Sequence, residues 1–244
     1  MAKTVLITGA SRGIGRSTAI SFASKGFQVA LNYYADTAAA EKTAEIVRSF
    51  GVFAEVFRAD VSNSAAVSAM VQEVVERFGS IDVLVCNAGI AQQRVFQDIT
   101  DEEWSRMIGV HLGGTFYCCR AVLPQMIQRK EGRIITLSSM WGVTGGSCEV
   151  HYSAAKAGII GLTKALAKEV GPSGITVNCV APGVVETDMC ADYDEQTLEA
   201  LRQEAPLGRL GTSQDVADAI EFLASDKAGF ITGQVLSPNG GIVI

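Results

Sequence analysis

The stretch TGASRGIG, residues 8–15, decides the fold of this chain. It follows the apolar run 5–7 and opens a long amphipathic stretch, so it lies where a strand passes into a helix. Glycines there allow a tight turn and a close approach of the backbone to a pyrophosphate, which the free N–H groups and positive dipole end of the helix attract. The spacing G-x-x-x-G-x-G is not the commoner G-x-G-x-x-G, and a glycine-rich turn alone can be structural. Its place at the first strand–helix junction favours a dinucleotide-binding unit.

Outward from this loop, short β-branched runs alternate with longer amphipathic stretches. Several runs are almost wholly apolar, as expected of strands covered on both faces. The predicted strands are 5–8, 29–32, 54–58, 83–86, 134–138, 176–181 and 235–238. The predicted helices are 14–25, 38–50, 65–78, 102–130 (as two helices), 152–170 and 214–224. The alternation predicts right-handed βαβ units and an α/β fold: one domain, 1–244, with a doubly wound parallel sheet flanked by helices on both faces.

Glycines and serines mark the expected helix ends. Left-handed C-caps are predicted at Gly26, Gly51, Gly79 and Gly132, and N-caps at Ser64 and Ser213. The least regular part runs from 182 to 211 and holds one predicted short helix, 195–204. A loop-rich insertion late in an α/β fold predicts a substrate lid, placed at 184–211.

Composition narrows the class of protein and its partners. Apolar residues make up 48% of the 244 and charged residues 19%, which permits a large core and argues against disorder. The net charge is −6 and no basic block occurs, so neither nucleic acid nor an anionic membrane is an expected partner. No run approaches the roughly 18 apolar residues of a membrane span, and 5–7 is too short for a secretory signal. A soluble, cytoplasmic protein is expected.

The cysteines show no metal or disulfide pattern. They are Cys86, Cys118, Cys119, Cys148, Cys179 and Cys190. None forms a C-x-x-C pair and no Cys/His cluster has zinc spacing, so no metal is expected and most are predicted to be buried, reduced thiols. His111 and His151 are the only histidines that could activate a cysteine, and neither lies in a cysteine-nucleophile signature.

The end of the second predicted strand bears on the choice of nucleotide. An acidic residue there would bind the adenosine ribose diol and repel a 2′-phosphate. Here the strand ends near the neutral Asn32, and no carboxylate follows before Asp36. Arg12 in the glycine loop can face the same phosphate, although an exposed, solubilising charge is the alternative. The pattern predicts NADPH/NADP+ rather than NAD.

Tyr152 and Lys156 are four residues apart and share one face of a predicted helix. A phenol has a pKa near 10, and a neighbouring ammonium favours the phenolate and lowers that pKa. Such a pair often arises by chance, but Ser138 and Ser139 close the fifth predicted strand, at the edge where open α/β sheets bind ligands. We interpret Ser139, Tyr152 and Lys156 as catalytic, with a turn or cap role for Ser139 as the alternative.

Together these motifs resemble the short-chain dehydrogenase/reductase family, and within it most closely the bacterial 3-oxoacyl-[acyl-carrier-protein] reductases. The matching residues span the chain: Thr8-Gly9-x-x-x-Gly13-x-Gly15, Asp60-Val61, Asn87-Ala88-Gly89, Ser139, Tyr152-x-x-x-Lys156, Pro182-Gly183 and Thr187. The resemblance implies a Rossmann-type fold. It also implies that Tyr152 donates a proton to the carbonyl oxygen, Ser139 polarises that oxygen, and Lys156 binds the nicotinamide ribose and lowers the pKa of Tyr152.

A larger set is predicted to bind the cofactor. It comprises Gly9, Ser11, Arg12, Gly13, Ile14, Gly15, Asn32, Asp60, Val61, Asn87, Ala88, Gly89, Tyr152, Lys156, Pro182, Gly183, Val185 and Thr187. The resemblance implies that Asp60 and Val61 bracket the adenine, Asn87 and Gly89 line the cofactor, and Thr187 contacts the carboxamide. Turn-forming roles for Asp60, Asn87 and 182–183, and a helix cap at Thr187, are the alternatives.

Three positions depart from the family pattern. Cys86 stands where the family has a second Asn, at a strand end where the exchange looks harmless. His111 stands at the place of a catalytic Asn, and an imidazole can also orient a water towards Lys156; a purely structural hydrogen bond is the alternative. Ser173 replaces an arginine common in carrier-protein reductases, which argues against carrier use. The basic pair 129–130 remains near another expected docking position.

The sequence thus predicts NADPH-dependent reduction of a ketone to a secondary alcohol, with a 3-oxoacyl thioester as the best guess and an acyl carrier protein as a candidate partner. One alternative is a carbonyl reductase for another ketone, on a small molecule or a modified protein side chain. Glu149 could meet a cationic substrate, or be only an exposed carboxylate at a helix start. A non-catalytic nucleotide-binding protein is the third interpretation, against which the intact Ser139, Tyr152 and Lys156 argue.

The apolar character of 113–130 and 152–170 predicts self-association. Phe116, Val122 and Leu123 crowd the first stretch, and Ile159, Ile160, Leu162 and Leu166 the second. One face of each helix would cover the sheet and the other would pair across a two-fold axis. We predict a homotetramer, the usual assembly of the family, with a dimer as the alternative.

Overall fold

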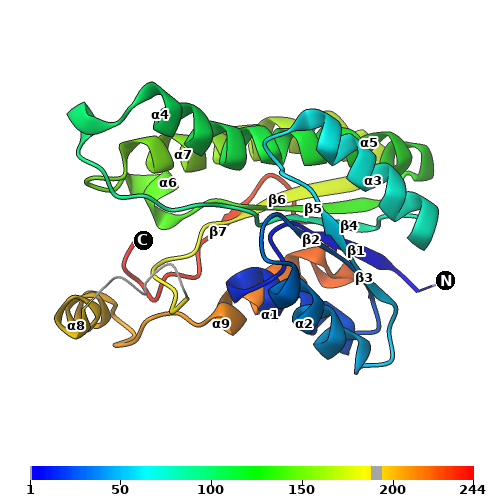
Figure 1. The fold of residues 1–244 in the computed structure, drawn as a ribbon, viewed down its shortest axis with the longest axis horizontal. Coiled ribbons are helices and arrows are strands. Elements are labelled where there is room, and N and C mark those ends of the chain that lie inside the picture. The colour runs from blue at the N-terminus through cyan, green and yellow to red at the C-terminus, as the bar shows by residue number, and fades with distance from the viewer. Residues whose placement is uncertain (1, 188–193) are drawn as a thin grey trace.

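Seven parallel strands form the centre of the molecule, in the order β3-β2-β1-β4-β5-β6-β7 (Figure 1). The computed structural model describes residues 2–187 and 194–244. The strands are β1 (Thr4–Ile7), β2 (Gln28–Tyr33), β3 (Ala54–Arg58), β4 (Val83–Cys86), β5 (Gly132–Leu137), β6 (Ile175–Val180) and β7 (Val235–Leu236). Every predicted strand is present. β7 is shorter than predicted, because only Val235 and Leu236 pair with β6.

Helices cover both faces of the sheet. They are α1 (Gly13–Ser24), α2 (Thr37–Arg48), α3 (Ser64–Phe78), α4 (Asp101–Ile108), α5 (Gly114–Arg129), α6 (Met140–Thr144), α7 (Val150–Val170), α8 (Glu195–Glu204) and α9 (Ser213–Ala224). Figure 1 shows α1, α2 and α9 on one face and α3, α5 and α7 on the other. The predicted doubly wound α/β fold is therefore confirmed.

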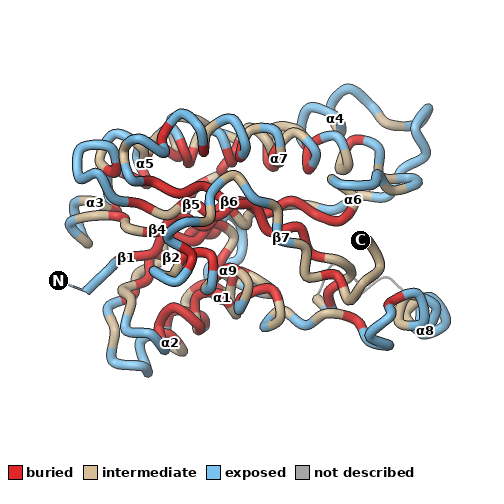
Figure 2. The backbone as a smooth tube through the Cα atoms, turned by 180° about the vertical axis from the view of Figure 1, so that it is seen from behind, coloured by how far each residue is buried: buried red, intermediate tan, exposed pale blue. Residues whose placement is uncertain are grey.

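Two apolar cores lie on the two faces of the sheet. Leu6 packs in one core with Val67 of α3 and Val122 of α5, whereas its neighbours in β1 belong to the other core, with Phe22 of α1. Successive side chains of a strand point to opposite faces, so a strand covered on both sides is apolar throughout. Figure 2 shows the strands as an almost continuous buried layer, and α8 contains no buried residue.

Several helix ends differ from their predicted positions. The N-cap of α3 is Asn63, which accepts from the Ala66 N–H, and that of α9 is Thr212, which accepts from the Asp215 N–H. The predicted caps Ser64 and Ser213 are wrong by one residue, because both serines are already helical and the polar residue before each accepts the orphan N–H. Gly26, Gly51 and Gly79 have positive φ angles of 82°, 78° and 84°.

Gly132 is not a C-cap. It begins β5, and Lys130 takes the left-handed conformation instead, with φ of 56°. The glycine is needed for close packing, because a Cβ there would lie 2.5 Å from the Met126 sulfur.

The stretch 102–130 contains two helices, as predicted, and between them a π-helical turn, Gly109–Gly113. Such a turn inserts an extra residue into a helix and is frequent at functional sites. The short helix α6 was not predicted, because five residues around Gly142 are too few to show a helical period.

The predicted lid, 184–211, contains the predicted helix 195–204 as α8. Its residues 188–193, and with them Cys190, lie outside the described residues, so the lid stays a prediction. In the described part of the chain, no helix combines the length and apolar character needed to cross a membrane. Four of the other cysteines are buried and unpaired, as predicted, whereas Cys148 is exposed.

Candidate active site

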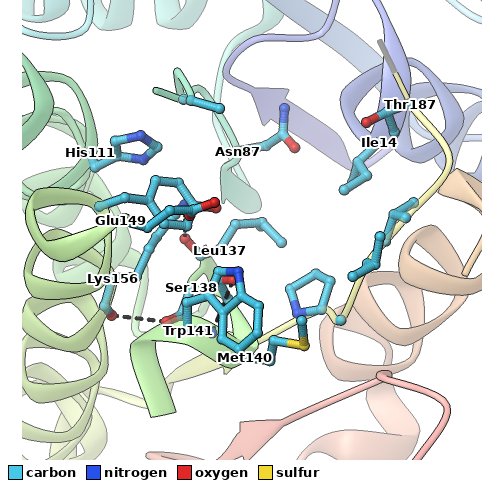
Figure 3. Close-up of a pocket in the computed structure, with 18 residues that line it drawn as sticks. Ile14, Asn87, His111, Leu137, Ser138, Met140, Trp141, Glu149, Lys156 and Thr187 are labelled. Carbon is cyan, nitrogen blue, oxygen red and sulfur yellow. Dashed lines mark hydrogen bonds between the residues drawn. The ribbon is translucent and has the colours of Figure 1, made fainter. Parts of the chain in front are cut away.

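A pocket opens where the strand order reverses between β1 and β4, beyond the carboxyl ends of the strands. Open α/β sheets bind their ligands at this place, because the connections that follow β1 and β4 run to opposite faces of the sheet and leave a crevice between them. The lining residues are Ile14, Asn87, Gly89, Ala91, His111, Leu137, Ser138, Ser139, Met140, Trp141, Glu149, Tyr152, Lys156, Pro182, Gly183, Val184, Val185 and Thr187 (Figure 3). The pocket thus brings together residues from α1, α6, α7 and the ends of β4, β5 and β6.

The glycine loop lies beside this pocket and is too crowded for side chains. A Cβ on Gly15 would lie 2.3 Å from the Gly9 carbonyl oxygen and 2.7 Å from Nδ2 of Asn87. Gly9 and Gly13 have positive φ angles of 64° and 54°, which favour glycine. The N-cap residue of α1 is Arg12, whose guanidinium has no acceptor for a cap, so the first N–H groups of the helix can bind an anion. The loop therefore fits the pyrophosphate of a dinucleotide.

Two asparagines hold this loop from behind. Asn87 Nδ2 donates to the carbonyls of Thr8 at 2.9 Å and Gly9 at 3.1 Å. Asn32 Oδ1 accepts from the Gly9 N–H at 3.3 Å, and its Nδ2 donates to the carbonyls of Phe57 and Ala59 at 3.2 and 3.1 Å. Asn32 is only 1% exposed. The structure thus places Asn32 beneath the loop as a support, and its predicted contact with the nucleotide stays a prediction.

The carbonyl of Ser11 anchors the loop to the first helix layer. It accepts from Arg16 Nη2 at 2.7 Å and from Thr43 Oγ1 at 3.0 Å. A Cβ on Gly13 would make an ordinary contact, 3.6 Å, with Cγ2 of Thr187, so the loop and the chain after β6 lie side by side.

Asp60 and Val61 follow β3 and do not line the pocket. Burial raises the pKa of Asp60, but hydrogen bonds from Ser62 and Arg106 outweigh it and hold that pKa below its usual value. The Arg106 contact is 2.9 Å long. Val61 is buried beneath Gly114, where an added Cβ would lie 2.9 Å from its Cγ2. Ala88 also lies outside the pocket, in contact with Gly9.

Tyr152 and Lys156 occupy the first two turns of α7, and the Lys156 Nζ lies 5.4 Å from the centroid of the Tyr152 ring. Lys156 is 5% exposed and donates to the Leu137 carbonyl at 2.8 Å. Burial disfavours the ammonium and lowers the pKa of Lys156 to about 8. The predicted i, i+4 pair is therefore present, with a lysine poised near neutral pH.

Ser139 faces the same pocket from the end of β5. It is also the N-cap of α6, because its Oγ accepts from the Trp141 N–H at 3.2 Å. The cap uses the oxygen as an acceptor and leaves the hydroxyl hydrogen to donate. The cap role of Ser139 is therefore present, and its catalytic role stays a prediction. The neighbouring Ser138 Oγ donates to the Lys156 carbonyl at 2.8 Å, a bond drawn in Figure 3 that ties β5 to α7.

His111 lies in the π-helical turn and is 1% exposed. Its Nε2 is 2.8 Å from the Ile90 carbonyl oxygen, and its ring meets the Tyr152 ring edge-on at 5.2 Å between centroids. Burial, and then the charge of Lys156, hold the pKa of His111 well below its usual value, so the ring is neutral. No residue in 2–187 or 194–244 bonds its Nδ1. That nitrogen is a buried polar atom at the pocket.

Sequence reasoning did not place several lining residues in the site, among them Ala91, Leu137 and Val184. Leu137 and Val184 adjoin Ser138 and Gly183, and their position at the carboxyl ends of two strands is the signal that could have identified them. Glu149 was noted in the sequence, but the structure makes it a pocket residue and not merely an exposed carboxylate at a helix start. It is half-buried, which raises its pKa, and a hydrogen bond from Gln93 opposes that effect.

Similar proteins cover almost all of the chain. A family model described as enoyl-(acyl carrier protein) reductase matches residues 9–243. The 3-oxoacyl-[acyl-carrier-protein] reductase FabG of Staphylococcus aureus (strain Mu50) is 44% identical over 242 residues, 99% of this chain and 98% of the relative. The protein of that name from Escherichia coli K12 is 40% identical over 241 residues, 98% of this chain and 97% of the relative.

A third relative carries a more general name. The uncharacterized oxidoreductase YmfI of Bacillus subtilis (strain 168) is 42% identical over 242 residues, which are 99% of both chains. The chain shares these identities over almost its whole length, and it has the Tyr152–Lys156 pair in a pocket beside the glycine loop. The chain therefore belongs to the short-chain dehydrogenase/reductase family and is an oxidoreductase acting on CH–OH and C=O groups.

Proposed function

We propose that this protein reduces a ketone to a secondary alcohol with NADPH, and that a 3-oxoacyl thioester is its best substrate. The observation that carries the proposal is the meeting of Ser139, Tyr152 and Lys156 in one pocket beside the glycine loop. The names of the FabG relatives support the thioester. The description of the family model names an enoyl substrate instead, so the test includes one.

The glycine loop and the N-terminus of α1 would hold the pyrophosphate, and the chain after β6 would flank the nicotinamide. Bound there, the reduced nicotinamide supplies the hydride for the carbonyl carbon. NADPH is favoured because Arg12 offers a cation to the 2′-phosphate. The first carboxylate after β2 is that of Asp36, which accepts from the Ala39 N–H at 2.9 Å as the N-cap of α2.

The protein's own side chains stabilise and then neutralise the negative charge that develops on the carbonyl oxygen. Ser139 donates a hydrogen bond to that oxygen, and Tyr152 gives it a proton. The ammonium of Lys156 favours the tyrosinate that this transfer leaves. His111, being neutral, can accept a hydrogen bond at Nδ1 and thereby hold a water that returns the proton.

The cofactor part of the proposal is tested by comparing kcat/KM for NADPH and NADH. NADPH should be preferred at least about tenfold, near 1.4 kcal/mol, and Arg12→Ala should weaken NADPH while leaving NADH nearly unchanged. Equal kcat/KM values for the two cofactors in the wild type would refute the cofactor assignment.

The chemistry is tested with a panel of 3-oxoacyl thioesters, amino ketones, cyclic ketones and an enoyl thioester, followed by NADPH oxidation. Tyr152→Phe should abolish ketone reduction while NADPH still binds, because the ring is kept and only the proton donor is lost. Tyr117→Phe, a change outside the pocket, is the control. Near wild-type reduction by Tyr152→Phe, or activity on the enoyl thioester alone, would contradict the proposal.

The proposal covers the 3-oxoacyl thioester group, and its presentation by an acyl carrier protein is tested separately. Of the basic pair 129–130, Arg129 is already bound within the chain, to Asp82 at 2.6 Å and to the Ile81 carbonyl at 2.7 Å. A comparison of carrier-bound and coenzyme-bound 3-oxoacyl groups separates the two substrates, and a lower KM for the carrier-bound form would support docking.

A further inference from the structure

A carboxylate faces the pocket where a carbonyl group would be reduced. Glu149 lines the pocket three residues before Tyr152, just before α7 begins. Gln93, a neutral amide, is the hydrogen-bonding side chain that acts on its pKa. Within residues 2–187 and 194–244, no lysine, arginine or histidine lies within 4.0 Å of its oxygens.

The basic groups near Glu149 are held by other partners. Arg94 pairs with Glu103 at 2.9 Å, although its backbone N–H contacts the loop at Cys148. Lys156 donates to the Leu137 carbonyl. The Nε2 of His151 lies 3.1 Å from the Gln92 side-chain oxygen, and burial lowers the pKa of His151.

Such a carboxylate works against the reaction when the substrate is neutral. Reduction builds negative charge on the carbonyl oxygen, and a nearby fixed negative charge raises the energy of that state. A positive charge on the substrate, close to the carbonyl, would pair with Glu149 and remove the penalty. The cation would also gain more in this half-buried place than in water.

An aromatic wall accompanies the carboxylate. Trp141 lines the same pocket, and a Cβ on Gly146 would lie 3.0 Å from two atoms of its indole, so the loop packs against the ring. Figure 3 shows Glu149 beside Lys156 and the Trp141 indole below them in the same pocket, towards Met140. An indole face combined with a carboxylate is a recurrent way to bind organic ammonium groups.

We propose that Glu149 and Trp141 select ketones that carry an ammonium group within a few bonds of the carbonyl, amino-substituted 3-oxoacyl groups included. This inference rests on the proposed ketone reductase function and names the substrate class of that site. Glu149 acts as a specificity residue: it touches the substrate and takes no part in proton transfer.

The test compares two ketones of equal shape, aminoacetone and butanone. The wild type should have at least about a tenfold higher kcat/KM for aminoacetone, the size of one ion pair worth about 1.4 kcal/mol. Glu149→Gln should remove this preference, because kcat/KM falls for aminoacetone with the loss of the ion pair and rises for butanone with the loss of the negative charge. Glu149→Asp, which keeps the charge, should keep most of the preference, and the remote surface change Glu45→Gln should have no effect.

A second measurement does not depend on turnover. Calorimetric binding of the product alcohols to NADP+-loaded protein should favour 1-aminopropan-2-ol over butan-2-ol, and Glu149→Gln should abolish that difference. Equal kcat/KM for both ketones in the wild type, or equal loss for both in Glu149→Gln, overturns the inference while ketone reduction stands. If neither ketone nor any thioester is reduced but the amino alcohol still binds through Glu149, the reductase function fails and the cation site stands.

Discussion

Lys156 carries its charge into the interior of the protein, and this makes its protonation sensitive to pH. Its pKa falls from 10.5 to about 8 on burial, so the ammonium is present below pH 8 and lost above it. We expect kcat/KM for ketone reduction to fall as the pH rises through about 8, because Tyr152 then loses its cationic neighbour. A pH–rate profile with saturating NADPH measures this, and a flat profile up to pH 10 would contradict it.

The same shift has a consequence for stability. Because the folded state binds the Lys156 proton less tightly than the unfolded state, the shift destabilises the fold below about pH 8. The free energy of unfolding therefore increases as the pH rises from about 8 towards 10.5.

Two variants of His111 distinguish a role of its buried imidazole in the proton relay from a purely structural role. If its open Nδ1 holds a water for the proton relay, His111→Asn should keep most of kcat and His111→Leu should lose at least about tenfold, near 1.4 kcal/mol. If the ring only bonds the Ile90 backbone, both variants should have similar kcat. Single-turnover rates at several pH values are the measurement, since a structural role would leave the pH profile unchanged.

The residues of the site could be predicted to different degrees. Ser139, Tyr152 and Lys156 could be placed together, because strand ends and helix spacing determine where they lie. The buried position of Asn32 could not be predicted, because its side chain turns inward to backbone groups at the end of β3 that are distant in sequence. The position of Glu149 in the pocket could not be predicted either, because it depends on α6 and the loop after it, whose sequences show no helical or strand period.

Among the secondary-structure elements, α1 and α7 offer a matched pair of glycines. Gly15→Ala in α1 should prevent NADPH binding or folding, because its Cβ would lie 2.3 Å from a backbone oxygen of the loop. Gly161→Ala in α7 has nothing within 4 Å and should stabilise the protein by up to about 1 kcal/mol. NADPH binding by fluorescence and thermal melting of both variants check this. Normal binding by Gly15→Ala would show that the loop is not the pyrophosphate site.

The elements themselves were predicted best where burial is most uniform. The strands β1, β4 and β5 are buried on both faces, and their apolar runs identify them without reference to the rest of the chain. The π-helical turn could not be predicted, since a single inserted residue leaves the 3.6-residue period of 102–130 almost intact. The N-caps of α3 and α9 were misplaced by one residue, because either of two adjacent polar residues can cap a helix. The backbone geometry determines which of them does so.

At the scale of the whole molecule, the exposed apolar residues of α5 and α7 bear on how many copies associate. Not all the apolar residues expected to pair are available, because Val122 and Ile159 are buried in the chain's own core. Phe116, by contrast, is 45% exposed on α5 and stacks with the Arg120 guanidinium. We still predict a homotetramer, with a dimer as runner-up. Light scattering at micromolar concentration measures the mass, and a monomer would refute both.

The support of the glycine loop by Asn87 also orders events during protein synthesis. The loop leaves the ribosome early, but the amide that holds its carbonyls comes 79 residues later. Lys156, whose bond to the Leu137 carbonyl spans 19 residues, comes later still. A nascent chain therefore lacks the amide that holds its glycine loop until Asn87 has been made, and the catalytic pair on α7 follows only after this support.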